Sequence, residues 1–166
     1  MITIIAGTNR KDSYTKRVAQ EYKRFLTEEK TESRIFSLDE FETHVRNDAF
    51  VQMENEMLKP AERFIIILPE YNGSYPGVLK MMIDNTDVAN VWWHKKVLLT
   101  GVSSGRAGNL RGMEHLTGSL LHLKMLVHHN RLPLSLISSL MNADFIFTDE
   151  VAIKSIKVQI EEFLRF

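Results

Sequence analysis

The chain has 166 residues, of which 44% are hydrophobic and 25% charged, and its 21 basic and 21 acidic residues cancel. This length fits one domain, 1–166, and the balanced charge argues against nucleic-acid binding and against a strongly acidic electron carrier. Because there is no cysteine, disulfides, thiolate metal sites and cysteine nucleophiles are excluded. No leader peptide or membrane-spanning run is evident, so we expect a cytoplasmic protein that binds neither membrane nor nucleic acid.

Strand-like and helix-like segments alternate along the chain. Strands are predicted over residues 2–6, 34–38, 64–68, 96–102 and 124–129. Helices are predicted over residues 13–28, 47–59, 76–86, 109–121 and 149–166. This alternation favours an α/β fold, a flavodoxin-like three-layer sandwich whose five-stranded parallel sheet has the order 2-1-3-4-5 and helices on both faces. In such a sheet the ligand lies at the carboxyl ends of the strands, so the loops after strands one, three and four should build the site.

The segment 7–15 links the first predicted strand to the first predicted helix and is rich in hydroxyl and cationic groups. Thr8, Ser13 and Thr15 offer hydroxyls, and Arg10 offers a planar fork of donors. Ser13 stands where a helix N-cap is expected, and the N–H groups at a helix start attract anions. The three-glycine turn of dinucleotide sites is missing. The segment therefore favours a phosphate monoester, with a polar turn capped by Ser13 as the alternative.

Two further loops follow the third and fourth predicted strands. Segment 69–77 carries Tyr71 and Tyr75, whose rings offer a surface to a flat heteroaromatic ligand, while its backbone offers hydrogen bonds at the ligand's edge. Segment 101–109 is rich in glycine, which lets a backbone approach a ligand closely. Taken alone, the first of these loops is explained equally well as a structural turn, and the second is explained somewhat better as a turn than as a site.

Together the three loops resemble the motifs of the NADPH-dependent FMN reductase family, a flavodoxin-like group that includes flavin, quinone and azo-dye reductases. The family's first motif, roughly Gly-Ser-x-Arg-x-x-Ser-x-Asn, is similar to residues 7–15. Its second, Pro-Glu-Tyr-Asn-x-Ser-x-Pro-Gly-x-Leu-Lys-Asn-x-Ile-Asp, matches residues 69–84 nearly throughout. Its third, of the type Ser-x-Gly-x-x-Gly-Gly, corresponds to residues 103–109. The chain departs from these motifs at Thr15, where the family has asparagine, and at Asn109, where it has glycine.

The resemblance implies that three groups of residues hold the cofactor FMN. The phosphate would be held by Thr8, Arg10, Ser13 and Thr15. The isoalloxazine ring would be bordered by Pro69, Glu70, Tyr71 and Asn72, with the backbone of Asn72 among the edge contacts. The other edge of the site would be lined by Ser103, Gly105 and Gly108. No side chain is assigned a catalytic role.

The activity implied by the resemblance is that of an FMN-dependent oxidoreductase. NADPH or NADH as co-substrate would reduce the bound flavin, and a small acceptor such as flavin or quinone would take the electrons. Family members are commonly dimers or tetramers, so we expect a homodimer or homotetramer, in which Trp92 and Trp93 either cover a partner subunit's flavin or close the local core. One alternative is an FMN-binding electron-transfer module without NAD(P)H activity. A second is a chain whose departures at Thr15 and Asn109 abolish flavin binding.

Two other kinds of site were weighed against this interpretation. His128 and His129 are adjacent in a predicted strand, which would point them to opposite faces of the sheet. His115 and His122 lack an evident third ligand, so no metal site is predicted. Ser104 lacks the spacing of a nucleophile elbow, which argues against a serine hydrolase.

Overall fold

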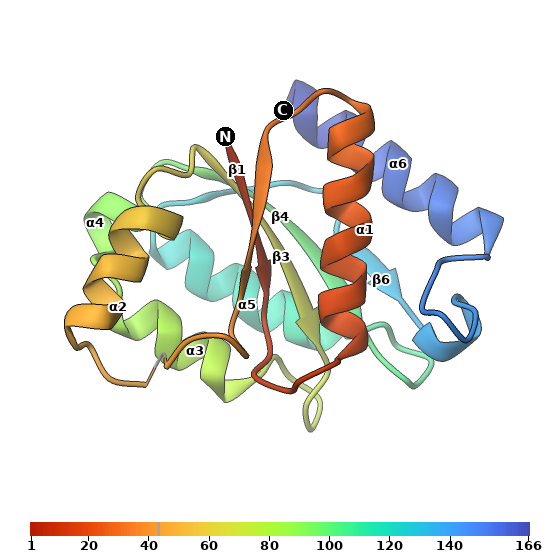
Figure 1. Ribbon diagram of the computed structural model, residues 1–166, viewed down its shortest axis with the longest axis horizontal. Coiled ribbons are helices and arrows are strands. Elements are labelled where there is room, and N and C mark those ends of the chain that lie inside the picture. The colour runs from red at the N-terminus through yellow and green to blue at the C-terminus, as the bar shows by residue number, and fades with distance from the viewer. Residues whose placement is uncertain (43) are drawn as a thin grey trace.

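A computed structural model describes residues 1–42 and 44–166, in which strands and helices alternate (Figure 1). The strands are β1 (Ile2–Ala6), β2 (Ser33–Ser37), β3 (Arg63–Pro69), β4 (Lys96–Val102), β5 (Leu126–Val127) and β6 (Leu132–Leu134). The helices are α1 (Tyr14–Glu28), α2 (Asp48–Met53), α3 (Gly77–Asn85), α4 (Val88–Val91), α5 (Leu110–His122) and α6 (Glu150–Arg165). A π-helical turn, η1 (Glu54–Leu58), continues α2, and a 3₁₀ turn, η2 (Ile137–Ser139), precedes α6. None of the helices described is long and apolar enough to cross a membrane.

All the strands belong to one parallel sheet of order β2-β1-β3-β4-β5, in which β6 also pairs with β4. This order confirms the flavodoxin-like topology expected from the sequence. β1 lies between β2 and β3, and β3 pairs with β4 along the full length of both strands. In Figure 1, β1 and β3 run toward the lower edge of the molecule, where the loops that follow them lie close together.

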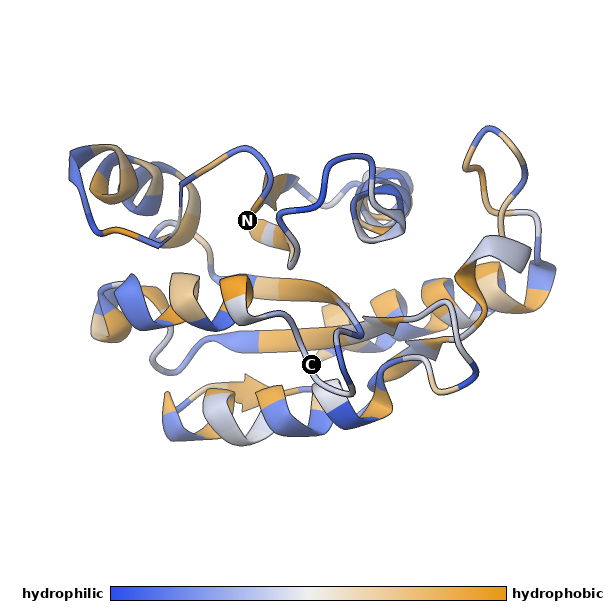
Figure 2. Cartoon of the chain, turned by 90° about the horizontal axis from the view of Figure 1, so that it is seen from below, coloured by the Kyte–Doolittle hydropathy of each residue, from blue (hydrophilic) through white to orange (hydrophobic). Residues whose placement is uncertain are grey.

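Helices cover both faces of the sheet, which explains why the central strand is apolar throughout. On one face, Ile65 and Ile67 of β3 pack with side chains of α1 and α6. On the other, Phe64 and Ile66 pack with side chains of α2, α3 and α5. Figure 2 shows the hydrophobic strands enclosed between these helical layers. A strand buried on both faces has no polar positions to alternate with, as is usual in parallel sheets.

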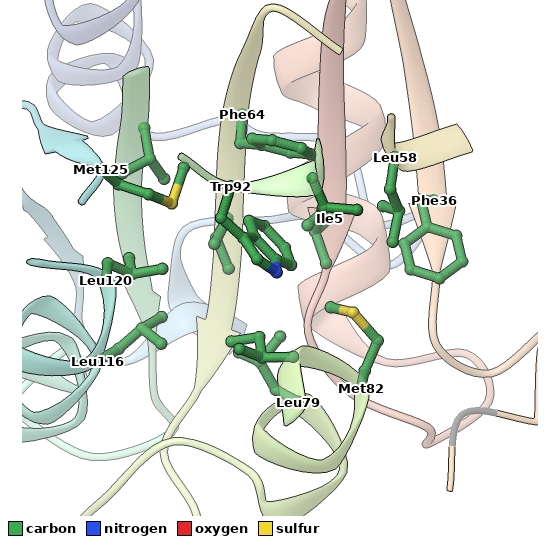
Figure 3. Close-up of a cluster of buried hydrophobic side chains, with 14 of the residues drawn as sticks. Ile5, Phe36, Leu58, Phe64, Leu79, Met82, Trp92, Leu116, Leu120 and Met125 are labelled. Carbon is green, nitrogen blue, oxygen red and sulfur yellow. The ribbon is translucent and has the colours of Figure 1, made fainter. Parts of the chain in front are cut away.

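Trp92 belongs to the core between the sheet and α3, and not to an exposed loop (Figure 3). Its ring packs against Phe64 at a centroid distance of 4.9 Å, and its indole Nε1 donates a hydrogen bond of 2.6 Å to Thr86 Oγ1. Of the two roles considered for it, closing the local core is the one that fits. Trp93 is 39% exposed.

Two predicted elements differ from the structure by more than one residue at an end, whereas the other predicted elements agree to within one residue at each end. The fifth strand, expected over 124–129, is wrong in its bounds, because the chain leaves the sheet after Val127 and returns as β6. The helix expected over 47–59 is α-helical only as far as Met53. Beyond that residue the Lys59 N–H bonds to the Glu54 carbonyl, five residues back, which is the π-helical pattern.

Candidate functional site

Three loops meet at the carboxyl ends of β1, β3 and β4, as the topology requires. They border a cavity of about 230 Å³, lined by Arg10, Lys11, Ser13, Tyr14, Thr15, Pro69, Glu70, Tyr71 and Ser104. Six of these residues are among those predicted from the sequence. Lys11, Tyr14 and Ser104 were not, although each is adjacent in the chain to a predicted residue.

The first loop ends in a well-formed helix start. Ser13 is the N-cap of α1, as predicted, and its hydroxyl oxygen accepts a hydrogen bond of 3.2 Å from the Lys16 N–H. A hydroxyl that accepts in this way keeps its own proton for donation. Thr15 is buried in the first turn of the helix. The helix start therefore offers hydroxyl and N–H donors beside the cavity, which suits an anion.

Tyr71 connects the first loop to the second. Its phenolic oxygen lies 2.5 Å from Thr8 Oγ1, and the Arg10 guanidinium lies 4.1 Å above the centre of its ring. Thr8 is buried, and its hydroxyl oxygen also accepts a hydrogen bond from the Arg10 N–H. An arginine stacked on an aromatic face loses little freedom when it binds a further group.

The second loop is a tight turn. Tyr71 and Ser74 exchange backbone hydrogen bonds of 2.8 and 3.1 Å, and the two residues between them, Asn72 and Gly73, both have positive φ. This is the type I′ geometry that an Asn-Gly pair favours. Because the turn closes through Tyr71 and Ser74, it does not consume the amide groups of Asn72 and Gly73. Asn72 itself is not among the residues that line the cavity.

The third loop folds on itself around Ser103. The Ser103 hydroxyl donates to the Gly105 carbonyl at 2.7 Å and accepts from the Gly108 N–H at 2.9 Å. Gly108 has a positive φ, and a Cβ there would lie 2.4 Å from Pro133, so packing against β6 already requires this glycine. A Cβ on Gly105 would meet nothing within 4 Å. Ser104 thus faces the cavity, whereas Ser103, Gly105 and Gly108 do not line it.

The cations that line the cavity are Arg10 and Lys11. Lys16, one turn into α1, instead binds the carboxylates of Asp39 and Glu40 at 3.0 and 2.7 Å. The hydrogen bond to Glu40, followed by the contact with Asp39, outweighs desolvation and raises the pKa of Lys16.

A larger cavity, of about 420 Å³, lies between α3 and α5, away from the three loops. It is lined by Lys80, Ile83, Asp84, His115, Gly118, Ser119, His122 and Leu123. Lys80 and Asp84 already pair with each other at 2.7 Å. We place the functional site at the smaller cavity, because three strand-end loops converge there, at the edge where a doubly wound sheet binds its ligand.

His128 and His129 do not point to opposite faces of a strand, so the reason given for that expectation is wrong. β5 ends at Val127, and the two rings lie side by side with centroids 4.5 Å apart. Their nitrogens and the Glu162 carboxylate lie within 4.8 Å of one another. Asn130 donates to both His128 Nδ1 and Glu162, which gives the cluster a structural explanation. That no metal binds stays a prediction.

Comparison with known proteins bears on the same three loops. The profile of a family described as NADPH-dependent FMN reductase matches residues 1–135. An NAD(P)H-dependent FMN reductase of Pseudomonas aeruginosa is 35% identical over 95 residues, 56% of this chain and 50% of that protein. An FMN-dependent NADH:quinone oxidoreductase of Mycoplasma pneumoniae is 40% identical over 67 residues, 37% of this chain and 34% of that protein. The chain therefore spans half or less of the length of these curated relatives.

Among solved structures, the flavoenzyme NAD(P)H:(acceptor) oxidoreductase of Paracoccus denitrificans is similar over nearly the whole chain. The TM-score is 0.83 at 23% sequence identity, with 99% of this chain and 94% of that chain covered. At this identity the similarity shows the fold alone, so the function has to be inferred from the residues of the loops.

Proposed function

Because the chain belongs to the NADPH-dependent FMN reductase family, we propose that it binds FMN at the three loops and transfers electrons from NADPH or NADH to a small acceptor. The observation that carries this proposal is the meeting of Arg10, Ser13 and Thr15 with Pro69 and Tyr71 around one cavity. These residues lie far apart in the sequence, yet they come together where a doubly wound sheet binds its ligand. The proposal favours a reductase over an electron carrier because the matched family consists of reductases.

The donor set of the first loop fits a phosphate monoester. Ser13 keeps a free proton on its hydroxyl, and Thr15 lies in the first turn of α1 beside it. Arg10 supplies a positive, forked donor that Tyr71 holds in place. We propose that these groups hold the FMN phosphate, together with Thr8, which fixes Tyr71 through its hydroxyl.

The second and third loops fit the edge of a flat ring. We propose that Pro69, Glu70, Tyr71 and the backbone of Asn72 border the isoalloxazine ring, with the loop of Ser103, Gly105 and Gly108 on its other side. Bound FMN would supply the two-electron chemistry. The three loops would hold the ring at the edge of the sheet, where the co-substrate and then the acceptor could reach it.

A direct test is to mix the purified protein and FMN with NADPH or NADH in the absence of oxygen and to follow the visible flavin band. We expect rapid bleaching with at least one of the two nucleotides, and no comparable rate for free FMN without protein. A flavin that binds but does not bleach would favour the electron-transfer module. Failure of FMN to bind at all would overturn the proposal.

The proposal extends to three finer points. We propose a quinone or a free flavin as the acceptor, a cytoplasmic location, and self-association into a dimer or tetramer. Met81 of α3 and Leu121 of α5 are large apolar side chains that are about half exposed on the helical layer that also carries Trp93, which supports self-association. Light scattering on the purified protein should give a mass of at least twice 19.2 kDa, and a monomer would contradict this point.

A further inference from the structure

Asn109 links the third loop directly to the strand that carries the second. It is the last residue of the third loop, immediately before α5, and it is fully buried. Its side-chain nitrogen donates hydrogen bonds to the carbonyl oxygens of Leu68 at 3.1 Å and Pro69 at 2.8 Å. These carbonyls lie at the end of β3, directly before Glu70 and Tyr71. One buried side chain thus joins two loops of the candidate FMN site.

Two glycines leave the space that the Asn109 side chain occupies. A Cβ on Gly112 would lie 2.1 Å from Asn109 Oδ1, and a Cβ on Gly101 would lie 3.1 Å from the Asn109 Cβ. Both glycines therefore leave the space that the side chain fills. Asn109 itself has a φ of 59°, in the left-handed region that asparagine tolerates better than most residues.

The two polar atoms of this side chain differ in how well they are satisfied. The nitrogen makes both of its hydrogen bonds, but Oδ1 is buried and has no hydrogen-bond partner among the residues that the structure describes. A buried oxygen without a partner destabilises a fold. Stability alone therefore does not explain why asparagine stands at position 109. A need for the two hydrogen bonds that its side chain donates does explain it.

Other contacts between α5 and the second loop are less protected. Arg111 packs over Gly73, and Ser74 Oγ lies 2.9 Å from His115 Nδ1, but Arg111 and His115 are exposed. Water competes for such contacts and weakens them. The base of the second loop is also joined to β4 by the Glu70 N–H, which donates to the Val102 carbonyl at 2.9 Å. The buried hydrogen bonds of Asn109 add a side-chain link from the far end of the third loop to the same backbone.

We propose that Asn109 is a positioning residue of the FMN site, which clamps the Pro69–Tyr71 backbone against the third loop and thereby sets how tightly and in what geometry the flavin ring is held. This inference rests on the proposed function. In this interpretation Asn109, which stands where the family has glycine, helps to hold the flavin. It does not abolish flavin binding.

The test uses two variants that act on the clamp in different ways. Asn109→Gly removes the donor and keeps the left-handed backbone accessible. Gly112→Ala leaves Asn109 in the chain but places a methyl group where its Oδ1 lies. We expect each to raise the Kd for FMN about tenfold, to shift the visible band of bound flavin, and to speed amide hydrogen exchange at residues 70–75 before FMN is added.

Two controls separate positioning from stability. Gln159→Ala also removes a buried amide that donates to two carbonyls, those of Leu99 and Asn130, but on the α6 side of the sheet. Gly118→Ala changes a glycine of the same helix α5 where a Cβ meets nothing within 4 Å. We expect Gln159→Ala to lower the melting temperature and Gly118→Ala to raise it by a few degrees, with the Kd and the exchange at 70–75 unchanged in both.

The outcomes separate this inference from the proposed function. If the wild-type chain binds FMN and both clamp variants match their controls in Kd, spectrum and exchange, the role of Asn109 is overturned alone. If the wild-type chain takes up no FMN, the proposed function falls and this inference with it.

Discussion

Arg10 is the cation whose surroundings say most about how an anion would be held. Its guanidinium stacks on Tyr71, and its backbone N–H donates to Thr8, so the residue is placed before any ligand arrives. We predict that Arg10→Ala weakens FMN binding by about 1.5–3 kcal/mol, because a charge-assisted hydrogen bond is lost. Titration of the flavin fluorescence with protein measures the change.

Arg165→Ala serves as the control for this prediction. It removes the same charge from an exposed position on α6, where Arg165 pairs with Glu161, and it should leave the FMN affinity unchanged. Equal affinities for wild type and Arg10→Ala would show that the phosphate is held elsewhere.

Glu54 is a buried carboxylate outside the site. It accepts from the Asp87 N–H and pairs with Arg46 at 2.9 Å and Lys59 at 3.3 Å. Burial alone would raise the pKa of Glu54, but the hydrogen bonds from Arg46, the Asp87 backbone and Lys59 outweigh burial, so the pKa lies below its usual value. The carboxylate therefore stabilises the fold while it is ionised.

We predict that Glu54→Gln lowers the free energy of unfolding by about 1.5–3 kcal/mol at pH 7. Because the pKa of Glu54 is lower in the folded state than in the unfolded one, the wild type should lose this advantage as the pH falls below about 4.3 and through the folded pKa. Urea unfolding at several pH values measures the difference. Glu56→Gln, at an exposed position in the same π-helical turn, should show no such loss, and a pH-independent difference for Glu54→Gln would contradict the argument.

At the scale of elements, the sequence predicted those whose signals are local. β1 and β4 agree with their predicted bounds, and Ser13 caps α1 as expected. The break between β5 and β6 was missed because each pairs with a different part of β4, a contact distant in sequence. The change from α2 to η1 was missed because no local pattern marks it: η1 begins at Glu54, and one of the partners of Glu54, the Asp87 N–H, lies 33 residues away.

The candidate site shows the same division. Motifs predicted which three loops would meet, and the structure brings them together around one cavity. The contact between Thr8 and Tyr71 joins residues 63 apart in the chain, and that between Asn109 and Pro69 joins residues 40 apart. No local pattern encodes such contacts, because they depend on how the strands are ordered.

The start of α6 provides a test of element stability. Asp149 is its N-cap, and its carboxylate accepts a hydrogen bond of 2.7 Å from the Ala152 N–H. We predict that Asp149→Ala lowers the free energy of unfolding by about 1 kcal/mol, whereas Asp149→Asn, which keeps an acceptor at the cap, changes it by a few tenths. Urea denaturation compares the two. Equal losses would mean that the charge matters and the cap hydrogen bond does not.

At the scale of the whole molecule, a ligand that binds only the folded chain must stabilise it. We predict that FMN at about one hundred times its Kd adds ~2.7 kcal/mol, which raises the melting temperature by about 5–10 °C for a chain of this size. Riboflavin, which lacks the phosphate, should raise it less at the same concentration. Equal shifts from both ligands would argue against a phosphate site in the first loop. Differential scanning fluorimetry monitored by tryptophan emission measures the shifts.

The interrupted edge of the sheet has a consequence for how the fold comes apart. β5 pairs with β4 at Lys96 and Val97, and β6 pairs with it from Thr100 onward. In the gap, the carbonyl of Leu99 receives its hydrogen bond from Gln159, a side chain of α6. A side chain of α6 thus supplies β4 with a hydrogen bond at a point where neither β5 nor β6 pairs with it. The edge of the sheet and α6 should therefore come apart in a single cooperative step.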